Sequence, residues 1–357
     1  MSLGYKAVGW SRHKRVYDAA VAGAVLLYIA AFFIASNIVY APPNTPGPEV
    51  VLIRATGSCA ILLLHVILCI GPLARLDRRV LPILYNRRHL GVITFLVALV
   101  HAAVVTGYYH GFGSIQPFLS LLTSNTNFSS LKAFPFEALG VVALVILFLM
   151  AATSHDFWLK NMDARAWKSL HMLVYPAYAL LIGHVALGAM QSDRGPTIPL
   201  LLALGVVIVS ALHLLAARRE ARTDQGTPAL ADGWIDVGPA ADIPEARARI
   251  VCAPAGERIA VFNHQGSISA VTNVCAHQGG PLGEGRIIDG CITCPWHGWQ
   301  YRPADGCSPP PFTEKIATIP VRITAGRVEV HPVALPPGTP VTPARLHDTR
   351  APEVSHH

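Results

Sequence analysis

Apolar residues dominate the first 216 positions of the chain, where they form six long runs separated by short polar segments. Each run holds about 20 residues, the length that an α-helix needs to cross the hydrocarbon core of a bilayer. The apolar run of the first segment is about twice as long as that of a secretory signal, so we expect it to be retained. The predicted spans are 17–40, 51–73, 90–109, 134–153, 167–190 and 198–216.

A different pattern follows the last apolar run. Short alternating segments at 258–262, 269–272 and 327–330 are separated by turn residues, which predicts a small antiparallel β domain. We therefore expect a multi-domain protein, an N-terminal all-α six-helix transmembrane bundle followed by an all-β domain. The predicted boundaries are 17–216 for the bundle, 217–231 for a linker, 232–333 for the β domain and 334–357 for a proline-rich tail, extended or disordered.

Composition and charge support this division. Hydrophobic residues make up 52% and charged residues 14% of the chain, and the mean hydropathy is +0.43, which excludes a disordered chain and is unusual for a wholly soluble protein. About fifteen Lys and Arg residues flank one side of the predicted spans, whereas the other side has only Arg54, Lys132 and Arg194. This bias places both termini and the β domain in the cytoplasm, and we expect a bacterial inner-membrane protein. The +7 formal charge thus reflects membrane orientation, not nucleic-acid binding.

Histidines inside the predicted spans are candidate cofactor ligands, because an ionisable side chain in hydrocarbon is costly and is retained for pairing, metal ligation or proton movement. His89 and His101 lie on the third span, and His171 and His184 lie on the fifth, which runs in the same direction. The spacings of 12 and 13 residues correspond to about 18 and 20 Å of helix. Two parallel helices with matched pairs predict two hemes, an inner one between His89 and His171 and an outer one between His101 and His184.

Other residues near the spans leave alternatives open. His65 on the second span is a second candidate for the inner ligand, and His213 is expected at the surface. Arg87 and Arg88 at the inner rim and Arg54 at the outer rim are candidate partners for heme propionates. In the alternative interpretation, the histidines are ordinary core residues bonded to backbone carbonyl groups of neighbouring helices.

Several short segments of the membrane half resemble the ferric reductase-like transmembrane domain family, over most of 19–216. The resemblance implies b-type heme held by histidines of the third and fifth helices, which carries over to His101, His171 and His184; His89 is a ligand only if the chain holds two hemes. The sequence departs from members that append flavin and nicotinamide domains, because its Gly-x-Gly at 283–285 does not fit a dinucleotide fingerprint. The segments are Arg54-Ala-Thr-Gly57, Gly71-Pro-Leu73, Arg87-Arg-His-Leu-Gly91 and Trp167-Lys-Ser-Leu-His171.

The β domain carries a second ligand pattern. Cys275-Ala-His277 is followed after sixteen residues by Cys294-Pro-Trp-His297. Two thiolates and two imidazoles on paired loops suit a Rieske [2Fe-2S] cluster, in which both cysteines bind one iron and both histidines bind the other. A structural zinc site is the alternative for the same atoms. Cys291, three residues before a ligand, is expected to be a free buried cysteine.

The flanking residues resemble Rieske ferredoxin (ISP-like) domains over about 234–331, and the resemblance carries the four cluster ligands over to Cys275, His277, Cys294 and His297. The additional cysteines of respiratory members are replaced by Gly280 and Trp296. The serine that raises the potential in those members is replaced by Trp299, although Tyr301 occupies the place of their tyrosine. We therefore expect a reduction potential toward the low end of roughly −150 to +300 mV.

Together these features predict membrane-bound electron transfer between a cytoplasmic cluster and one or two b-type hemes, toward quinone or an external acceptor. The alternatives are a heme-free anchor that presents a ferredoxin to a cytosolic oxygenase or reductase, and a redox sensor. No acid–base constellation is evident, so any enzymatic activity would be that of an oxidoreductase. Expected partners are membrane lipid and a redox protein or quinone, without nucleic acid. The direction of electron flow and the oligomeric state stay open.

Overall fold

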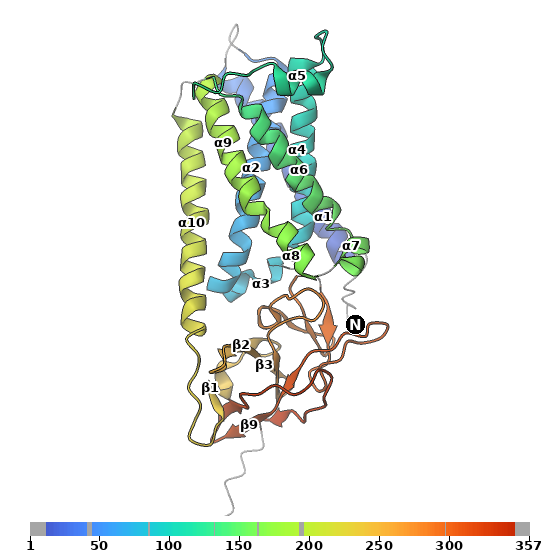
Figure 1. Cartoon of the computed structure of the whole chain (residues 1–357), viewed down its shortest axis with the longest axis vertical. Coiled ribbons are helices and arrows are strands. Elements are labelled where there is room, and N and C mark those ends of the chain that lie inside the picture. Colours follow the sequence, from blue (N-terminus) through green and yellow to red (C-terminus); the bar gives the residue numbers. More distant parts are fainter. Residues whose placement is uncertain are drawn as a thin grey trace, which may run out of the picture. The chain divides into compact units, whose positions relative to one another are not determined.

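The computed structural model describes residues 12–40, 45–84, 86–131, 133–162, 164–192, 196–296 and 298–346. The chain forms two compact units, shown with their elements in Figure 1. Among the described residues, the first, which we call the helical unit, lies within 12–71 and 86–213. The second, the β unit, lies within 72–84 and 214–346, so it includes the ends of two long helices.

Apolar helices build the helical unit, as the hydrophobic runs predict. The most extensive contact between two of its helices joins α6 and α9. Two short elements, η1 (Arg78–Val80) and α3 (Leu81–Leu84), belong to the β unit. The other helices are α1 (Arg12–Val39), α2 (Pro48–Leu76), α4 (Arg87–His110), α5 (Pro117–Thr123), α6 (Phe136–Ala152), α7 (Asp156–Asn161), α8 (Ala164–Met172), α9 (Val174–Ser192) and α10 (Thr197–Thr223).

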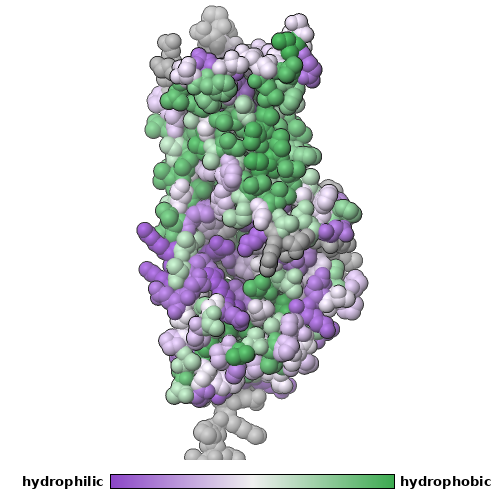
Figure 2. All heavy atoms as spheres, in the orientation of Figure 1, coloured by the Kyte–Doolittle hydropathy of each residue, from purple (hydrophilic) through white to green (hydrophobic). Residues whose placement is uncertain are grey.

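Five helical segments of the described residues are long and apolar enough to cross a membrane, not the six that we predicted. The fourth predicted span corresponds to α6, which has only 17 residues. Large apolar side chains cover the outer surface of the helices, visible as the green region in Figure 2. Such a surface is stable in lipid but not in water. The five spans are Lys14–Val39, Pro48–Leu76, Arg87–His110, Ala166–Gly188 and Thr197–Thr223.

The fifth predicted span is not one continuous helix. It is divided into α8, which ends at Met172, and α9, which begins at Val174. Pro176 lies in the first turn of α9, where its missing N–H is tolerated. The regular rise that we assumed between His171 and His184 is therefore interrupted, and the depth of His171 cannot be derived from residue spacing alone.

Polar side chains within the helices find partners on their own backbone. The hydroxyl groups of Thr56, Thr94 and Thr106 each donate to the carbonyl group four residues earlier, at 2.7 to 2.8 Å. Hydroxyl groups that are satisfied in this way can be placed in an apolar environment at little cost. These residues therefore need no functional explanation.

Among the described residues, three antiparallel sheets form the β unit. The strand orders are β1-β10-β9, then β11-β4-β3-β2 with β8 also paired to β4, and finally β5-β6-β7. The segments that alternation predicted as strands lie in β3, β4 and β10, which confirms them. The strands are β1 (Ile235–Pro239), β2 (Ala248–Cys252), β3 (Arg258–His264), β4 (Ser267–Thr272), β5 (Arg286–Ile288), β6 (Cys291–Thr293), β7 (Gln300–Tyr301), β8 (Thr318–Ile319), β9 (Val321–Thr324), β10 (Arg327–Val330) and β11 (Ala344–Arg345).

The central strand β3 is buried on both faces. Ile259 and Val261 belong to a core shared with β1 and β10, whereas Ala260 and Phe262 belong to a second core. Because successive side chains of a strand point to opposite faces, one strand supports both cores. The second core also contains Cys275 and Cys294, so the candidate cluster loops are anchored by the packing of the domain.

The structure describes both segments that flank the β domain, where we expected a linker and an extended or disordered tail. Helix α10 continues to Thr223, and the backbone N–H of Thr227 then donates to Cys252 of β2 at 2.8 Å. Beyond residue 334, Leu335 donates to Thr318, and β11 pairs with β4. The prolines of this segment lack a backbone N–H, but the N–H groups of its other residues still form hydrogen bonds with the β domain. Residues 347–357 lie outside the described residues.

Candidate cofactor sites

Two histidines from different helices face each other in the helical unit. The ring centres of His101, on α4, and His184, on α9, lie 6.4 Å apart with nearly perpendicular planes. Each Nδ1 lies 3.0 Å from a carbonyl oxygen of another helix, that of Ile53 for His101 and that of Phe136 for His184. Because a carbonyl group only accepts, Nδ1 carries the proton and Nε2 keeps its lone pair for a ligand.

Two glycines make room for these imidazole rings. A Cβ atom on Gly57 would lie 2.9 Å from the ring of His101, and a Cβ atom on Gly140 would lie 2.8 Å from the ring of His184. Real Cβ atoms do not approach so closely, so any other residue would displace the ring. Gly57 occurs in a segment that carried the family resemblance, whereas our sequence analysis did not identify Gly140.

The two half-sites repeat the same local arrangement. Around each of the two histidines, a neighbouring helix contributes the carbonyl group that bonds Nδ1 and, four residues later, the glycine that contacts the ring. The histidine itself lies 48 residues after the carbonyl residue. All three positions are offset by 83 residues (53 to 136, 57 to 140 and 101 to 184). The chain thus presents two equivalent imidazoles to a common centre.

The separation of the rings fits coordination of one metal ion. A metal–imidazole bond of about 2.0 Å, with about 1.1 Å from the nitrogen to the ring centre, gives about 6 Å between two rings on opposite sides of the ion. The observed 6.4 Å agrees with this value. The residues present therefore fit bis-histidine ligation of a heme iron.

His171, the inner candidate on α8, has a different environment. Its Nδ1 lies 3.0 Å from the Trp167 carbonyl oxygen, and its ring stacks on Trp167 with 3.8 Å between centres. Its Nε2 is buried without a hydrogen-bond partner among the described residues. A buried nitrogen that lacks a partner is costly unless it has a ligand, so His171 stays a candidate.

His89 pairs with an acidic residue of α1. Its Nδ1 lies 2.9 Å from a carboxylate oxygen of Asp18, 71 residues earlier in the chain. A carboxylate on Nδ1 is the usual second partner of a metal-bound histidine, because it fixes the ring and makes Nε2 more basic. The structure brings together His101 and His184, whereas His89 contacts Asp18 and His171 contacts Trp167.

His65 and His213 both lie against neighbouring helices. A Cβ atom on Gly205 of α10 would lie 2.3 Å from Nε2 of His65, so this nitrogen faces the backbone of α10 and has no room for a heme. His213 bonds through Nδ1 to Val209 of its own helix, and its Nε2 lies 3.4 Å from the Tyr175 hydroxyl. Neither geometry favours metal ligation.

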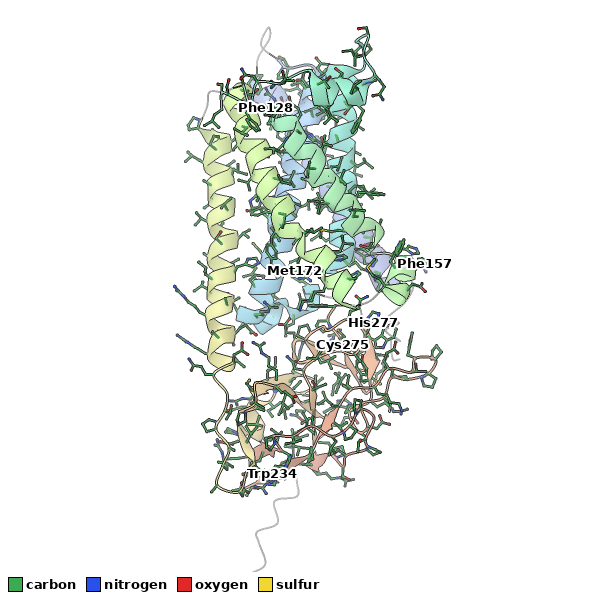
Figure 3. All side chains as sticks on the ribbon, viewed as in Figure 1. Phe128, Phe157, Met172, Trp234, Cys275 and His277 are labelled. Carbon is green, nitrogen blue, oxygen red and sulfur yellow. The ribbon has the colours of Figure 1, made fainter. Side chains whose placement is uncertain are left out.

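The candidate cluster residues lie on two adjacent loops of the β unit. Cys275 and His277, labelled in Figure 3, follow β4, and Cys294 follows β6. A Cβ atom on Gly280 of the first loop would lie 2.7 Å from Sγ of Cys294 in the second, so glycine is required for the loops to meet. The fourth predicted ligand, His297, lies outside the described residues.

Trp299 supports the first histidine of this site. Its indole ring is stacked on the imidazole of His277, with 4.1 Å between centres and 4° between planes. Phe312 lies against Trp299 at 4.3 Å, and Trp299 is only 4% exposed. The stack fixes the orientation of His277 and excludes water from one face of its ring.

Polar groups around Cys275 favour its thiolate. Burial raises the pKa of the Cys275 thiol, but hydrogen bonds from Cys294, from the Tyr301 hydroxyl and from the backbone N–H groups of His277 and Gln278 together lower it to about 7. The pKa of the Tyr301 hydroxyl is raised by burial and by Cys275, so Tyr301 stays protonated and can donate to Sγ, 3.2 Å away.

Replacing Tyr301 with phenylalanine is expected to lower the reduction potential of the cluster by about 50 mV, because a hydrogen bond to a ligand sulfur stabilises the more negative, reduced state by about 1 kcal/mol. An EPR-monitored redox titration of the full chain measures the shift. The matched control, Tyr175→Phe, alters a tyrosine of the helical unit and should leave the potential unchanged. A potential that does not fall in Tyr301→Phe contradicts this role.

The fold and these sites define an integral membrane protein with an apolar helical part and a β domain of the iron–sulfur type. Comparison with protein families agrees. Residues 56–182 match the model of the ferric reductase like transmembrane component, and residues 233–320 match that of the Rieske [2Fe-2S] domain. The chain belongs to the ferric reductase-like transmembrane family and carries a Rieske [2Fe-2S] domain after it.

Relatives match one half of the chain or the other. The protein-methionine-sulfoxide reductase heme-binding subunit MsrQ of Caulobacter vibrioides is 31% identical over 160 residues, which is 44% of this chain and 70% of the relative. Cholesterol 7-desaturase nvd 1 of Ciona intestinalis is 33% identical over 106 residues, which is 29% of this chain and 22% of the relative. The chain spans only 15% to 23% of the length of three such desaturases.

The solved structures that resemble this chain cover less than a third of it. A complex of reduced oxygenase and oxidised ferredoxin of carbazole 1,9a-dioxygenase contains a chain with 25% identity, which covers 29% of this chain and 97% of that one, with a TM-score of 0.28.

Proposed function

We propose that this protein transfers single electrons through a membrane, between a cytoplasmic Rieske cluster and b-type heme in the helical unit, toward quinone or an external acceptor. The observation that carries the proposal is the 6.4 Å separation of the His101 and His184 rings, which suits one iron. The name of the MsrQ relative as a heme-binding subunit supports the same cofactor. The cluster and the heme supply the one-electron chemistry, whereas the chain binds them, orients them and excludes water.

The proposed ligands follow from the two sites. Cys275 and Cys294 would hold one iron of the cluster, with His277 and His297 on the other. His101 and His184 would hold the outer heme. His171 and His89 would hold an inner heme, if a second one binds.

The proposed topology has six spans. Helix α6, with 17 residues, reaches the lower limit for a membrane-spanning helix, so we count it as the sixth. The excess of positive residues on one side supports the proposed orientation, in which both termini and the Rieske domain lie in the cytoplasm of a bacterial inner membrane. We assign 17–216 to the membrane domain and 232–333 to the Rieske domain.

Reductive titration of the purified full-length protein in detergent tests the function. Optical spectra should show a heme Soret band that shifts on reduction, and EPR should show a Rieske signal. When the cluster is reduced first, the heme should follow. A protein with the Rieske signal and no Soret band would instead support the anchored ferredoxin, the second candidate, for which the Rieske domain of the nvd relatives is the supporting observation.

Replacing Asp18 with asparagine is expected to raise the potential of the inner heme by about 50 mV. The amide accepts a weaker hydrogen bond from His89 than the carboxylate does, so Nε2 becomes less basic and stabilises the ferric state less. A redox titration followed by heme absorption measures the effect. The conservative variant Asp18→Glu should keep the original value, and unchanged heme potentials in Asp18→Asn would exclude His89 as a ligand.

A further inference from the structure

One buried donor of the β unit lacks an acceptor in the protein. The indole nitrogen Nε1 of Trp299 has no hydrogen-bond partner among the described residues, and the residue is only 4% exposed. An indole N–H can donate but not accept, and a buried tryptophan usually finds a partner for it. Because an unpaired buried donor is costly, this N–H requires an acceptor that the described residues do not supply.

The surroundings of the indole ring disfavour water as that acceptor. The imidazole of His277 lies parallel to the indole at 4.1 Å, and the ring of Phe312 lies against it at 4.3 Å. Trp299 also belongs to the second hydrophobic core of the domain. A buried water needs several polar partners to hold it, and aromatic faces and a hydrophobic core are poor partners.

Trp299 contacts residues of both cluster loops. Its side chain stacks on His277 in the first loop, and its backbone carbonyl accepts from the N–H of Cys294 in the second loop at 2.8 Å. Cys275 and Cys294 share the hydrophobic core with it. A [2Fe-2S] cluster held by these loops brings inorganic sulfides, which are negatively charged acceptors, next to the indole.

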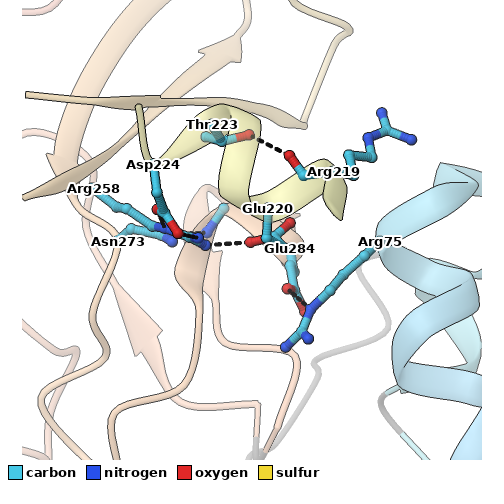
Figure 4. A network of polar contacts seen from close by, with 9 residues as sticks. Arg75, Arg219, Glu220, Thr223, Asp224, Arg258, Asn273 and Glu284 are labelled. Carbon is cyan, nitrogen blue, oxygen red and sulfur yellow. Dashed lines mark hydrogen bonds and ion pairs between the residues drawn. The ribbon is translucent and has the colours of Figure 1, made fainter. Parts of the chain in front are cut away.

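Backbone and side-chain bonds within the β unit hold the first loop beside the indole. The backbone N–H of Asn273 donates to the carbonyl of Arg258 on β3 at 2.9 Å, and Figure 4 shows these two residues side by side. Oδ1 of Asn273 accepts from the backbone N–H of Gly283 at 2.7 Å, and its carbonyl accepts from Leu282 at 2.9 Å. These bonds close the loop at its base, so the position of His277 against Trp299 is defined by the fold of the domain.

We propose that the indole N–H of Trp299 donates a hydrogen bond to an inorganic sulfide of the Rieske cluster and thereby raises its reduction potential. One-electron reduction makes the cluster more negative, so a donor to its sulfur stabilises the reduced state more than the oxidised state. We expected a low potential because Trp299 replaces a serine, and this donor raises the potential above the value expected from the loss of the serine alone. The proposal rests on cluster binding and does not require heme.

Pulsed EPR of the reduced cluster in the full-length protein tests the hydrogen bond directly. The protein is prepared with tryptophan that carries ¹⁵N only at the indole nitrogen. Spin density passes through a hydrogen bond to a cluster sulfur, so an indole bonded in this way gives a ¹⁵N coupling, which stacking or packing alone does not produce. We expect the coupling in the wild type and its loss in Trp299→Phe, which keeps an aromatic ring against His277. Trp296→Phe, which removes the neighbouring indole of the second loop, should keep it.

The reduction potential gives a second readout. Trp299→Phe is expected to lower the equilibrium constant for reduction of the cluster about fivefold, which corresponds to a potential about 40 mV lower. An EPR-monitored redox titration measures the shift. Trp234→Phe is the matched control, because it makes the same substitution in the same unit at a ring that contacts Arg322 at 4.2 Å. Its potential should equal that of the wild type.

The outcomes separate this bond from cluster binding and from stability. A wild-type Rieske signal without ¹⁵N coupling, a coupling that persists in Trp299→Phe, or an unchanged potential in that variant would overturn the proposal. If Trp299→Phe does not assemble a cluster, the comparison of the wild type with Trp296→Phe decides, since a coupling lost in Trp296→Phe belongs to the other indole. A missing Rieske signal in the wild type contradicts the proposed function itself.

Discussion

Replacing His101 or His184 with alanine is expected to remove the outer heme from the purified protein, which is half of the total heme if two hemes bind and all of it if one binds. The iron would lose one of its two imidazole ligands, which the structure places with 6.4 Å between ring centres. Heme content per chain, measured by the pyridine hemochromogen method, and the Soret band of the oxidised protein report the loss.

His213→Ala is the matched control, because it removes an imidazole from a helix of the same bundle that bonds to its own backbone at Val209. It should retain the wild-type heme content. Thermal unfolding in detergent identifies any general damage to the bundle. Wild-type heme content in both His101→Ala and His184→Ala would contradict the assigned ligands.

Replacing Cys275 or Cys294 with serine is expected to abolish the cluster, so that the Rieske EPR signal falls at least about tenfold. Serine binds iron poorly because its hydroxyl does not ionise near neutral pH, whereas the cysteine thiolate is the metal ligand. Iron and acid-labile sulfide per chain measure the loss. The β domain should also become less stable, since both cysteines belong to its second core.

Cys291→Ser provides the control for this experiment. Cys291 lies on strand β6, three residues before Cys294. Burial raises the pKa of its thiol, which disfavours the thiolate form that binds metal. The variant should retain cluster and EPR signal. Loss of the cluster in Cys291→Ser, with retention in Cys294→Ser, would reverse the assignment.

The sequence was sufficient for those parts of the fold that follow from local periodicity. Alternation of apolar residues predicts β3, β4 and β10, because a strand places successive side chains on opposite faces. Length and apolarity likewise predict most of the spans. The break at Leu173 was not predicted, because the apolar run continues through it and only Pro176 marks the start of a new helix.

The candidate sites were predictable only where they depend on polar or metal-ligating residue types. Histidine in an apolar span and a cysteine–histidine motif are visible in one sequence, whereas Gly140 carries no chemical group that would attract attention. The contact between Asp18 and His89 joins residues 71 positions apart. Such pairs depend on how the helices pack, and no local pattern specifies that packing.

The close approach of Gly57 and Gly140 to the imidazole rings has a consequence for recognising related chains. Each glycine precedes its histidine by 44 positions (57 to 101 and 140 to 184). A homologue that keeps both histidines but has a bulkier residue at either glycine would retain the apparent metal-binding motif without the space to use it. The diagnostic signature is therefore the combination of both glycines with both histidines. A search for the histidines alone would wrongly identify such a chain as a heme-binding protein.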